Sequence, residues 1–356
     1  MPISEDHAQK DAYRTGVGPS NRPPFGRRRE RKLSSFAFPV KVLPPLFVSF
    51  NSIEALVAAL PGPTRTSHEV EIRRVAALGL PPAVSLRTLA TLFGVSAEFV
   101  GAMSRAPSRY YRVFKIKKGK KTRVIQAPMV ALKLLQAWFA HHVAAAVQLP
   151  DCVYGFVPGR SGVKEAAKHH CPASWVYSLD VRDFFPSITE AQVRDALVRI
   201  GYANGTADLL SRLLTLNGAL PQGSPASPVI SNLVFGPTDN QLVALAGELG
   251  VRYTRYADDL VFSGGDAPPA TLQERARAIV NGAGWVIAEG KEHLAQSPAR
   301  LKVHGLLVHG DRPRLTKGYR NRIRAFKHLL AAGKISAADL TKIRGHLAYS
   351  DFIDKE

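Results

Sequence analysis

Two neighbouring aspartates, Asp258 and Asp259, stand at the centre of residues 252–263, a stretch rich in aromatic and β-branched residues. Such residues on both sides of a short polar centre predict a tight hairpin with the carboxylates at its turn. Two ionised carboxylates repel each other at a turn unless a cation lies with them. Mg²⁺ is the cation that suits hard oxygen ligands, so the pair indicates a metal site, although a solvated turn explains such a pair as well.

A third carboxylate, Asp180, lies near the end of the apolar run 176–181, far from Asp258 in the sequence. A strand-end aspartate that meets a hairpin-tip pair gives the arrangement that holds two Mg²⁺ ions about 4 Å apart, where they stabilise the attacking and leaving oxygens of phosphoryl transfer. Taken alone, Asp180 fits equally well as a residue that caps the next turn. The three aspartates together favour the two-metal interpretation.

A basic hairpin at residues 117–121 offers groups for the phosphates of a nucleotide. Lys117 and Arg123, on either side of it, could fold over a triphosphate, because the planar guanidinium fork meets phosphate oxygens in pairs. The alternative is a solvated hairpin surface, which explains the other lysines of the turn better than it explains Arg123.

Residues 220–228 are predicted to form a loop stiffened by Pro and Gly. This loop, which contains Gln222 and Gly223, has little side-chain bulk and suits close backbone approach to the sugar or base of a nucleotide. Phe185, five positions after Asp180, would stand beside the same pocket. A bulky ring there excludes a 2′-hydroxyl, and the alternative for it is packing in the core.

The charge of the chain points to nucleic acid. Its 356 residues include 48 Lys and Arg against 28 Asp and Glu, a net charge of +20, while 46% of the residues are hydrophobic. Such a field concentrates anions at the surface, and nucleic acid is the commonest partner for it. The length predicts two or three domains.

The two cysteines, Cys152 and Cys171, predict no disulfide framework and hence a reducing compartment. Cys171 follows His169 and His170, but no second ligand pair completes a zinc site. No apolar run approaches the roughly 20 residues that span a bilayer, and no signal peptide is visible, so we expect a cytoplasmic protein without a membrane partner.

Periodicity, caps and breakers predict a mixture of helices and strands, an α+β fold. The predicted helices cover 51–60 (capped by Asn51 and ended by Pro61-Gly62-Pro63), 85–93 (capped by Ser85 and stopped by Gly94), 96–103 (capped by Ser96), 130–147, a segment from about 189 (capped by Thr189), 228–249 and 270–283. The predicted strands cover 110–116, 122–125, 176–181, the two arms around Asp258-Asp259, 285–287, and a hairpin of 302–308 with 313–316.

Both ends of the chain are basic. Residues 1–35 are rich in Pro, Gly and Ser, include a run of Arg and Lys at 27–32, and are expected to be a disordered arm. From Gly318 onward the chain is predicted to be helical. Residues 312–344 contain ten Lys and Arg, and Asp339 is the single acidic residue among them.

Over roughly residues 85 to 328 the sequence resembles reverse transcriptases, and within them the bacterial retron type. The motifs that carry the resemblance occur in the family's order and are Tyr110–Phe114, Arg123–Pro128, Tyr154–Ser161, Asp180 with Phe184–Ile188, Pro221–Pro228, Tyr256-Ala257-Asp258-Asp259, Gly284-Trp285 with Lys291, and Gly305–Val308.

The resemblance implies a role for each matched residue. The catalytic residues would be Asp180, Asp258 and Asp259, and the predicted metal site, for two Mg²⁺ ions, comprises these three and Val181. Phe185 would be the sugar gate, and nucleotide binding would involve Lys117, Arg123, Phe185, Gln222 and Lys291. Gly305 and Leu306 would belong to the primer grip.

The implied fold is a right-hand polymerase with fingers, a palm built on an antiparallel sheet that carries the Tyr-Ala-Asp-Asp hairpin, and a helical thumb. The expected divisions are an arm at 1–35, an N-terminal helical extension at 36–105, fingers at 106–175, palm at 176–300, a primer-grip hairpin at 301–317 and a basic thumb at 318–356.

Resemblance to the retron type implies a structured non-coding RNA as template and primer, an RNA–DNA duplex, dNTP substrates, a branched RNA–DNA product (msDNA), and a role in antiphage defence with an effector protein. Two elements typical of retron enzymes differ: Ala166 replaces the asparagine of Asn-Ala-x-x-His, and His304 replaces the threonine of Val-Thr-Gly. The alternatives are an abortive-infection, diversity-generating or group II-like reverse transcriptase, and a nucleic-acid-binding scaffold without catalysis.

Overall fold

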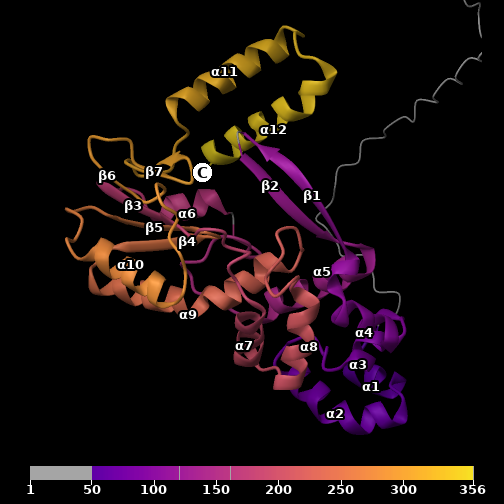
Figure 1. Cartoon of the computed structure of the whole chain (residues 1–356). Helices are drawn as coiled ribbons and strands as arrows, with labels where there is room; N and C mark the ends of the chain where they lie inside the picture. The colour runs from indigo at the N-terminus through magenta and orange to yellow at the C-terminus, as the bar shows by residue number, and fades with distance from the viewer. Residues whose placement is uncertain (1–49, 120, 161, 356) are drawn as a thin grey trace, which may run out of the picture. The chain divides into compact units, whose positions relative to one another are not determined.

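The computed structural model describes residues 50–119, 121–160 and 162–355, so the arm expected at 1–35 lies outside the described residues. The chain divides into residues 1–42 and residues 43–356, and the description that follows concerns the second unit (Figure 1).

A four-stranded antiparallel sheet lies at the centre of this unit. Its strands are β3 (Trp175–Asp180), β4 (Arg252–Tyr256), β5 (Asp259–Gly264) and β6 (His293–Gln296), in the order β4-β5-β3-β6. The strand predicted at 285–287 is wrong, because Ile287 makes only an isolated bridge to Val181 and the edge strand β6 follows later. The predicted antiparallel sheet with its hairpin is confirmed.

Apolar side chains enter a core on each face of the sheet, with a period of two along β3 and β5. On β3, Trp175, Tyr177 and Leu179 enter the main core, together with Leu260 and Phe262 of β5. The alternate residues Val176 and Val261 enter a second core instead. Helices α9 (Ser227–Glu248) and α10 (Leu272–Gly282) lie against the first face, and α6 (Val163–His169) lies on the other side (Figure 1).

The described N-terminal part is helical, with α1 (Ile53–Ala59), α2 (Gly62–Ala77), α3 (Leu86–Phe93) and α4 (Ala97–Arg105). The caps of α3 and α4 are Ser85 and Ser96, and Gly94 ends α3 at φ 62°, as the sequence predicts. The cap of α1 is Ser52 and not Asn51, because the Ser52 hydroxyl accepts from the backbone amide of Ala55.

Pro61-Gly62-Pro63 ends α1, as predicted. The same residues also start α2, a helix that is not predicted from the sequence, since a proline in the first turn loses no helical hydrogen bond. Helix α8 (Asn204–Leu214) was also not predicted, and it begins without a side-chain cap.

The finger segment is a two-stranded ribbon of β1 (Tyr111–Lys118) and β2 (Lys121–Pro128), preceded by η1 (Pro107–Tyr110) and followed by α5 (Val130–Ala146). Helix α7 (Glu190–Ile200) starts at the predicted cap Thr189, where Gln192 completes a capping box. The buried Gln136 of α5 joins the ribbon to α8. Its amide donates to the hydroxyl of Tyr111 in β1 and to the carbonyl of Leu213 in α8.

The C-terminal part begins with β7 (Lys302–Val303) and β8 (Leu306–Leu307), which pair across a turn at His304-Gly305. The hairpin predicted across residues 309–312 is therefore only partly right, since its second arm makes a single bridge between Leu307 and Arg314. Helices α11 (Lys317–Ala331) and α12 (Ala337–Asp354) follow, in agreement with the helical structure predicted from Gly318 onward.

Among the described helices none is by itself long and apolar enough to cross a membrane. Helices α3 and α4, bent by 118° at their junction, satisfy length and composition only as a pair. Much of each of these two helices is buried inside the protein.

Candidate active site

The two neighbouring aspartates lie where the sequence predicts them. Strands β4 and β5 pair as far as Tyr256 opposite Asp259, which leaves Ala257 and Asp258 as a two-residue turn. Ala257 adopts φ 57°, the left-handed region that such a hairpin turn needs at its first position. The turn therefore holds the Asp258 backbone at the tip of the hairpin.

Asp180 meets this hairpin through the register of the sheet. It is the cross-strand partner of Asp259, and the Val181 amide donates to the Asp258 carbonyl at 2.9 Å. Partners on adjacent strands point to the same face, and the alternation of β3 and β5 assigns Asp180 and Asp259 to the face of the second core. The three aspartates thus come together as predicted, although they are distant in sequence.

The carboxylates influence one another. The pKa of Asp258 is raised, first by burial and then by the negative charges of Asp180 and Asp259, while its own backbone amide and the Lys291 ammonium act in the opposite direction. This mutual repulsion is the electrostatic situation that a cation relieves.

Two basic side chains already lie against these carboxylates. The Lys291 ammonium donates to Asp180 Oδ1 at 2.5 Å, and His304 Nδ1 lies 3.6 Å from Asp259 Oδ2. Within the part of the chain that the structure describes, no three Asp, Glu, His or Cys side chains are grouped so that they could already hold a metal ion. The donors nevertheless are carboxylate oxygens, whose chemistry fits a hard divalent cation.

A row of aromatic rings borders the site. Phe156 lies between Phe185 and Tyr256, with ring centres 6.2 Å and 6.3 Å away, and Tyr256 contacts the His304 ring at 5.2 Å. Phe185 is only partly buried, so it is not a plain core residue. Phe156, which has φ 64° and is 40% exposed, was not singled out from the sequence, where only its place within the motif 154–161 draws notice.

The loop at residues 220–228, the Gln222 loop, packs against the ribbon of β1 and β2, the finger ribbon. The Gln222 carbonyl accepts from the Gln126 amide of β2 at 2.9 Å. Gly223, at φ 136°, lies so close to this strand that an added Cβ would be 2.8 Å from the Gln126 carbonyl oxygen and 3.0 Å from the Ile125 side chain. Glycine is therefore required for the contact between loop and ribbon.

The register of the ribbon separates Lys117 from Arg123. Lys117 pairs with Thr122, and Arg123 pairs with Ile116, so the two basic side chains leave the ribbon on opposite faces. Arg123 shares its face with Ile125, the residue that contacts the loop at Gly223. The structure thus brings Arg123, and not Lys117, to the side of the Gln222 loop.

The two predicted primer-grip residues lie in the small hairpin β7–β8. Gly305 occupies its turn at φ 86°, and Leu306 is buried in the second core. Because His304 of the same turn faces Asp259, this hairpin stands directly beside the aspartates.

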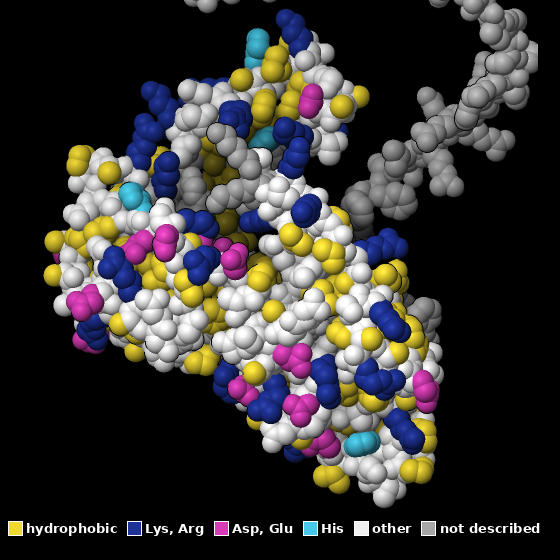
Figure 2. Space-filling view, viewed as in Figure 1, with side chains coloured by type: hydrophobic (Ala, Val, Ile, Leu, Met, Phe, Trp, Pro, Cys, Tyr) yellow, Lys and Arg dark blue, Asp and Glu magenta, His cyan; other side chains and the backbone are white. Residues whose placement is uncertain are grey.

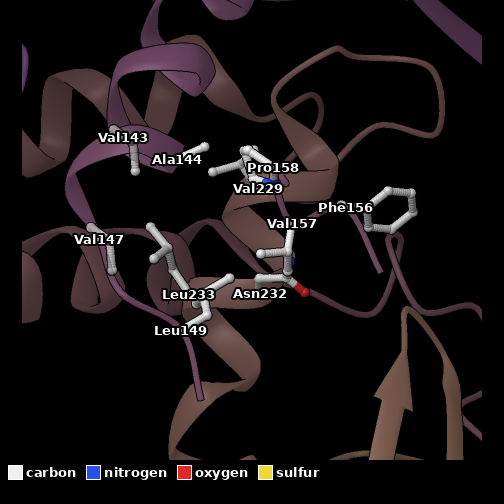
Figure 3. Close-up of a pocket in the computed structure, with 10 residues that line it drawn as sticks. All are labelled: Val143, Ala144, Val147, Leu149, Phe156, Val157, Pro158, Val229, Asn232 and Leu233. Atoms are coloured by element: carbon white, nitrogen blue, oxygen red, sulfur yellow. The ribbon is translucent and has the colours of Figure 1, made fainter. Parts of the chain in front are cut away.

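A small cavity is lined in part by Phe156 (Figure 3). Its volume is about 20 Å³, room for about one water molecule, and its lining is apolar apart from Asn232. Phe156 stands apart from the other lining side chains in this view. The cavity is far too small for a nucleotide, so it is not the substrate site.

Comparison with known proteins identifies the family. Residues 116–297 match the family "Reverse transcriptase (RNA-dependent DNA polymerase)". Retron Mx65 reverse transcriptase of Myxococcus xanthus is 32% identical over 310 residues, covering 80% of this chain and 71% of that protein. Retron Ec86 reverse transcriptase of Escherichia coli is 29% identical over 290 residues, covering 80% of this chain and 89% of that protein.

Among solved structures, apo telomerase of Candida tropicalis, truncated from its C-terminal domain, is similar with a TM-score of 0.44 and 9% identity, covering 62% of this chain and 61% of that one. This likeness is too weak to carry an argument. The family match spans half of the chain, and the Myxococcus protein is aligned over most of both lengths. The chain therefore belongs to the reverse transcriptase family of RNA-directed DNA polymerases, and within it to the retron type.

Proposed function

We propose that Asp180, Asp258 and Asp259 are the catalytic residues with which this chain adds deoxynucleotides to a primer on an RNA template, using two Mg²⁺ ions. The observation that carries the proposal is the register that sets Asp180 opposite Asp259 beside the Asp258 turn. Membership of the family implies use of an RNA template and dNTPs and dependence on divalent metal ions in general. The identity of the ion, the number of ions and the residue roles are part of the proposal.

The metal ions, when bound, would stabilise the attacking and leaving oxygens of the displacement. The carboxylates of the three aspartates would hold them, with the Val181 backbone beside the Asp258 turn. Lys291 is paired with Asp180 and would meet the phosphates of an incoming nucleotide once that carboxylate engages a metal. Arg123 would contact the same phosphates from the ribbon face that meets the Gln222 loop.

Phe185 would act as the gate against a 2′-hydroxyl. Its ring touches Phe156 on one side and the buried Phe184 on the other, and these contacts limit its freedom to turn away from a ribose. Gln222, in the loop that Gly223 holds against the ribbon, would contact the incoming nucleotide.

Helix α11 offers a phosphate-binding face. Lys317, Arg320 and Arg324 are exposed and follow the three- and four-residue spacing of one helix face. Tyr319 and Phe326 contact His346 of α12 instead, which turns the basic face outward. Figure 2 shows Lys and Arg side chains along the thumb and around the hollow beneath it. The thumb would follow the backbone of an RNA–DNA duplex.

The retron character extends the proposal to the product. We propose that the enzyme binds one structured non-coding RNA, primes from a 2′-hydroxyl within it and makes branched RNA–DNA, and that it acts in the cytoplasm with an effector protein against phage. This part rests on the similarity to retron enzymes.

The product is tested by sequencing the nucleic acid that copurifies with the protein from its host. Short DNA joined through a 2′-linked branch to one small RNA is the expected result. DNA copied from many unrelated RNAs, or no linked DNA, would contradict the retron product and favour another kind of reverse transcriptase.

A further inference from the structure

An ion pair lies completely buried beneath the turn Ala257-Asp258, the proposed catalytic turn. Arg255 of β4 and Asp239 of α9 are both 0% exposed. The Arg255 Nε and Nη2 atoms donate to the two carboxylate oxygens of Asp239 at 2.8 Å and 2.7 Å, and the Tyr253 hydroxyl donates to the same carboxylate. Burying two charges is costly and rarely increases stability over an apolar pair of the same size, so the pair calls for a role besides stability.

The remaining donor of Arg255 reaches the turn itself. Its Nη1 atom donates to the Ala257 carbonyl at 3.2 Å and to Asn232 Oδ1 at 3.0 Å. Asn232 in turn donates to the Gly155 carbonyl at 2.9 Å. Gly155 lies so close to the turn that an added Cβ would be 2.6 Å from the Ala257 nitrogen. The backbone of the turn is therefore held from two sides.

The turn needs this support for two reasons. Ala257 is held at φ 57°, a conformation that side chains with a Cβ disfavour. Asp258, which follows it, is repelled by the charges of Asp180 and Asp259. Both effects push the turn away from the observed geometry.

We propose that Arg255 is a positioning residue for Asp258, whose guanidinium, oriented by Asp239 and Asn232, fixes the Ala257 carbonyl and so the catalytic turn. A lysine cannot replace it, because only the planar fork of five donors serves the Asp239 carboxylate, the Asn232 amide and the Ala257 carbonyl together. The inference rests on the proposed catalytic role of Asp258.

The first test is Arg255→Lys, measured as the maximal rate of dNTP incorporation on a primed RNA template. The variant keeps the charge opposite Asp239 but loses the contact to Ala257, and we expect a rate roughly 100-fold lower, the effect of misplacing a reacting group by about 1 Å. Its thermal midpoint should fall, because the buried Asn232 and Ala257 acceptors lose their donor. The rate is therefore measured well below that midpoint, where the affinity for primer–template should stay close to that of the wild type. Arg275→Lys, in an exposed pair with Glu248, is the matched control and should keep the wild-type rate.

The second test is rescue. In the Arg255→Lys background, Ala257→Gly removes the conformational cost of the positive φ, and we expect the rate to rise several-fold above that of the single variant. A purely structural role for Arg255 would leave the rate unmoved by this change.

The third variant separates position from stability. Asp239→Leu with Arg255→Met replaces the ion pair by apolar side chains of similar size, which proteins tolerate without loss of stability. A folded double variant with a slow rate supports the inference, and a folded double variant with the wild-type rate overturns it, as does a wild-type rate in Arg255→Lys.

If neither change yields a folded protein, Asn232→Ala decides, because it leaves the ion pair intact and removes the amide that joins the Arg255 guanidinium to the Gly155 carbonyl. A lowered rate in that variant supports the inference, and an unchanged rate overturns it. Failure of the proposed function is distinguished by the wild type itself, which would then incorporate no more dNTP than Asp258→Asn.

Discussion

At the scale of single residues, the site is dominated by repulsion among three carboxylates. Asp180 and Asp259 face each other across two strands, and Asp258 adds a third carboxylate whose pKa is raised by burial and by both neighbours. Lys291 and His304 supply the nearest positive or polar groups. The same side chains that a polymerase needs for metal ions are thus destabilising to the protein when no cation accompanies them.

The gate assignment gives the first prediction. Phe185→Ala removes the ring beside Phe156, so ribonucleotides should compete better, with relative incorporation of rNTP over dNTP rising by about 10-fold or more, on the scale of a lost steric contact. Competition between rATP and dATP on one template measures this. An unchanged ratio would remove the assignment, and Phe139→Leu, in the buried core of α5 away from the Phe185 ring, serves as the control that should leave the ratio alone.

A buried histidine gives a prediction about pH. His170 is held between Ser263 Oγ and Thr254 Oγ1, each 2.7 Å away, and its pKa is lowered well below 6.5, first by burial and then by the charges of His169, Arg252 and His304. The unfolded chain takes up a proton near pH 6.5 that the folded chain refuses. Stability is therefore full above that pH and falls below it, by about 1.4 kcal/mol per pH unit for each such proton.

Urea unfolding at about pH 7.5 and about pH 5.5, on either side of the unfolded pKa, measures this loss. His170→Gln, which retains hydrogen-bonding groups, should flatten the dependence. The same change at the exposed His169 should flatten it less, although the pKa of His169 is also lowered by burial. An equal pH dependence in His170→Gln and the wild type would contradict this account.

At the scale of elements, the site depends on contacts between segments that are distant in the chain. The finger ribbon meets the Gln222 loop through one backbone hydrogen bond and the close approach at Gly223. Strand β4 meets α9 through the buried pair of Arg255 and Asp239. The hairpin β7–β8 reaches the aspartates through His304. Each contact sets the position of one group of the proposed nucleotide site.

The contact between loop and ribbon is tested by Gly223→Ala. The new Cβ would meet the Gln126 carbonyl at a backbone φ of 136°, so the loop must shift. We expect a loss of about 1–3 kcal/mol in the free energy of unfolding together with a raised KM for dNTP. Gly205→Ala in α8, where nothing lies within 4 Å, is the control and should keep or slightly increase stability.

Much of this arrangement can be predicted from the sequence. The rest depends on contacts between segments that are distant in the chain. The aromatic and β-branched flanks of Asp258-Asp259 predict the hairpin, and Thr189, Ser85 and Ser96 predict helix starts, because these signals act over a few residues. Tertiary contacts carry no such local signal. The partnership of Arg255 with Asp239, and the place of Phe156 between two other rings, appear only when α9 and residues 150–157 pack against the hairpin.

Register explains the remaining difference. The sequence suggests Lys117 and Arg123 as one phosphate-binding pair. A shift of one residue in the strand pairing, however, decides which face of the ribbon a side chain occupies. The pairing of Lys117 with Thr122 and of Arg123 with Ile116 puts them on opposite faces. Their assignment to the nucleotide, like the domain boundaries, stays a prediction.

At the scale of the whole molecule, charge and architecture agree. A net charge of +20 is carried by a chain whose thumb presents Lys317, Arg320 and Arg324 on one face of α11. The apolar faces of the palm sheet are used on both sides, by α9 and α10 and by the second core. The positive charge is therefore exposed, where nucleic acid can bind. The sheet is packed on both faces, and the aspartates lie at its strand ends.

Salt dependence tests the thumb. Replacing Lys317, Arg320 and Arg324 by Gln should weaken binding of an RNA–DNA duplex and flatten the plot of log affinity against log salt by about 2–3 units of slope, because each neutralised phosphate releases counterions. Fluorescence anisotropy over a salt series gives the slope. Gln at Arg73 and Arg74 of α2 is the control. A slope that the thumb changes leave untouched would contradict the duplex-binding role.

The most direct measurement is dNTP incorporation on a primed RNA template by the purified chain, compared with the Asp258→Asn variant in the presence of Mg²⁺. We predict RNA-templated extension of the primer by the wild type. The variant should bind the same duplex with unchanged affinity and extend it no faster than a reaction without protein. A wild type that extends no primer, or an Asp258→Asn variant as active as the wild type, would contradict the account.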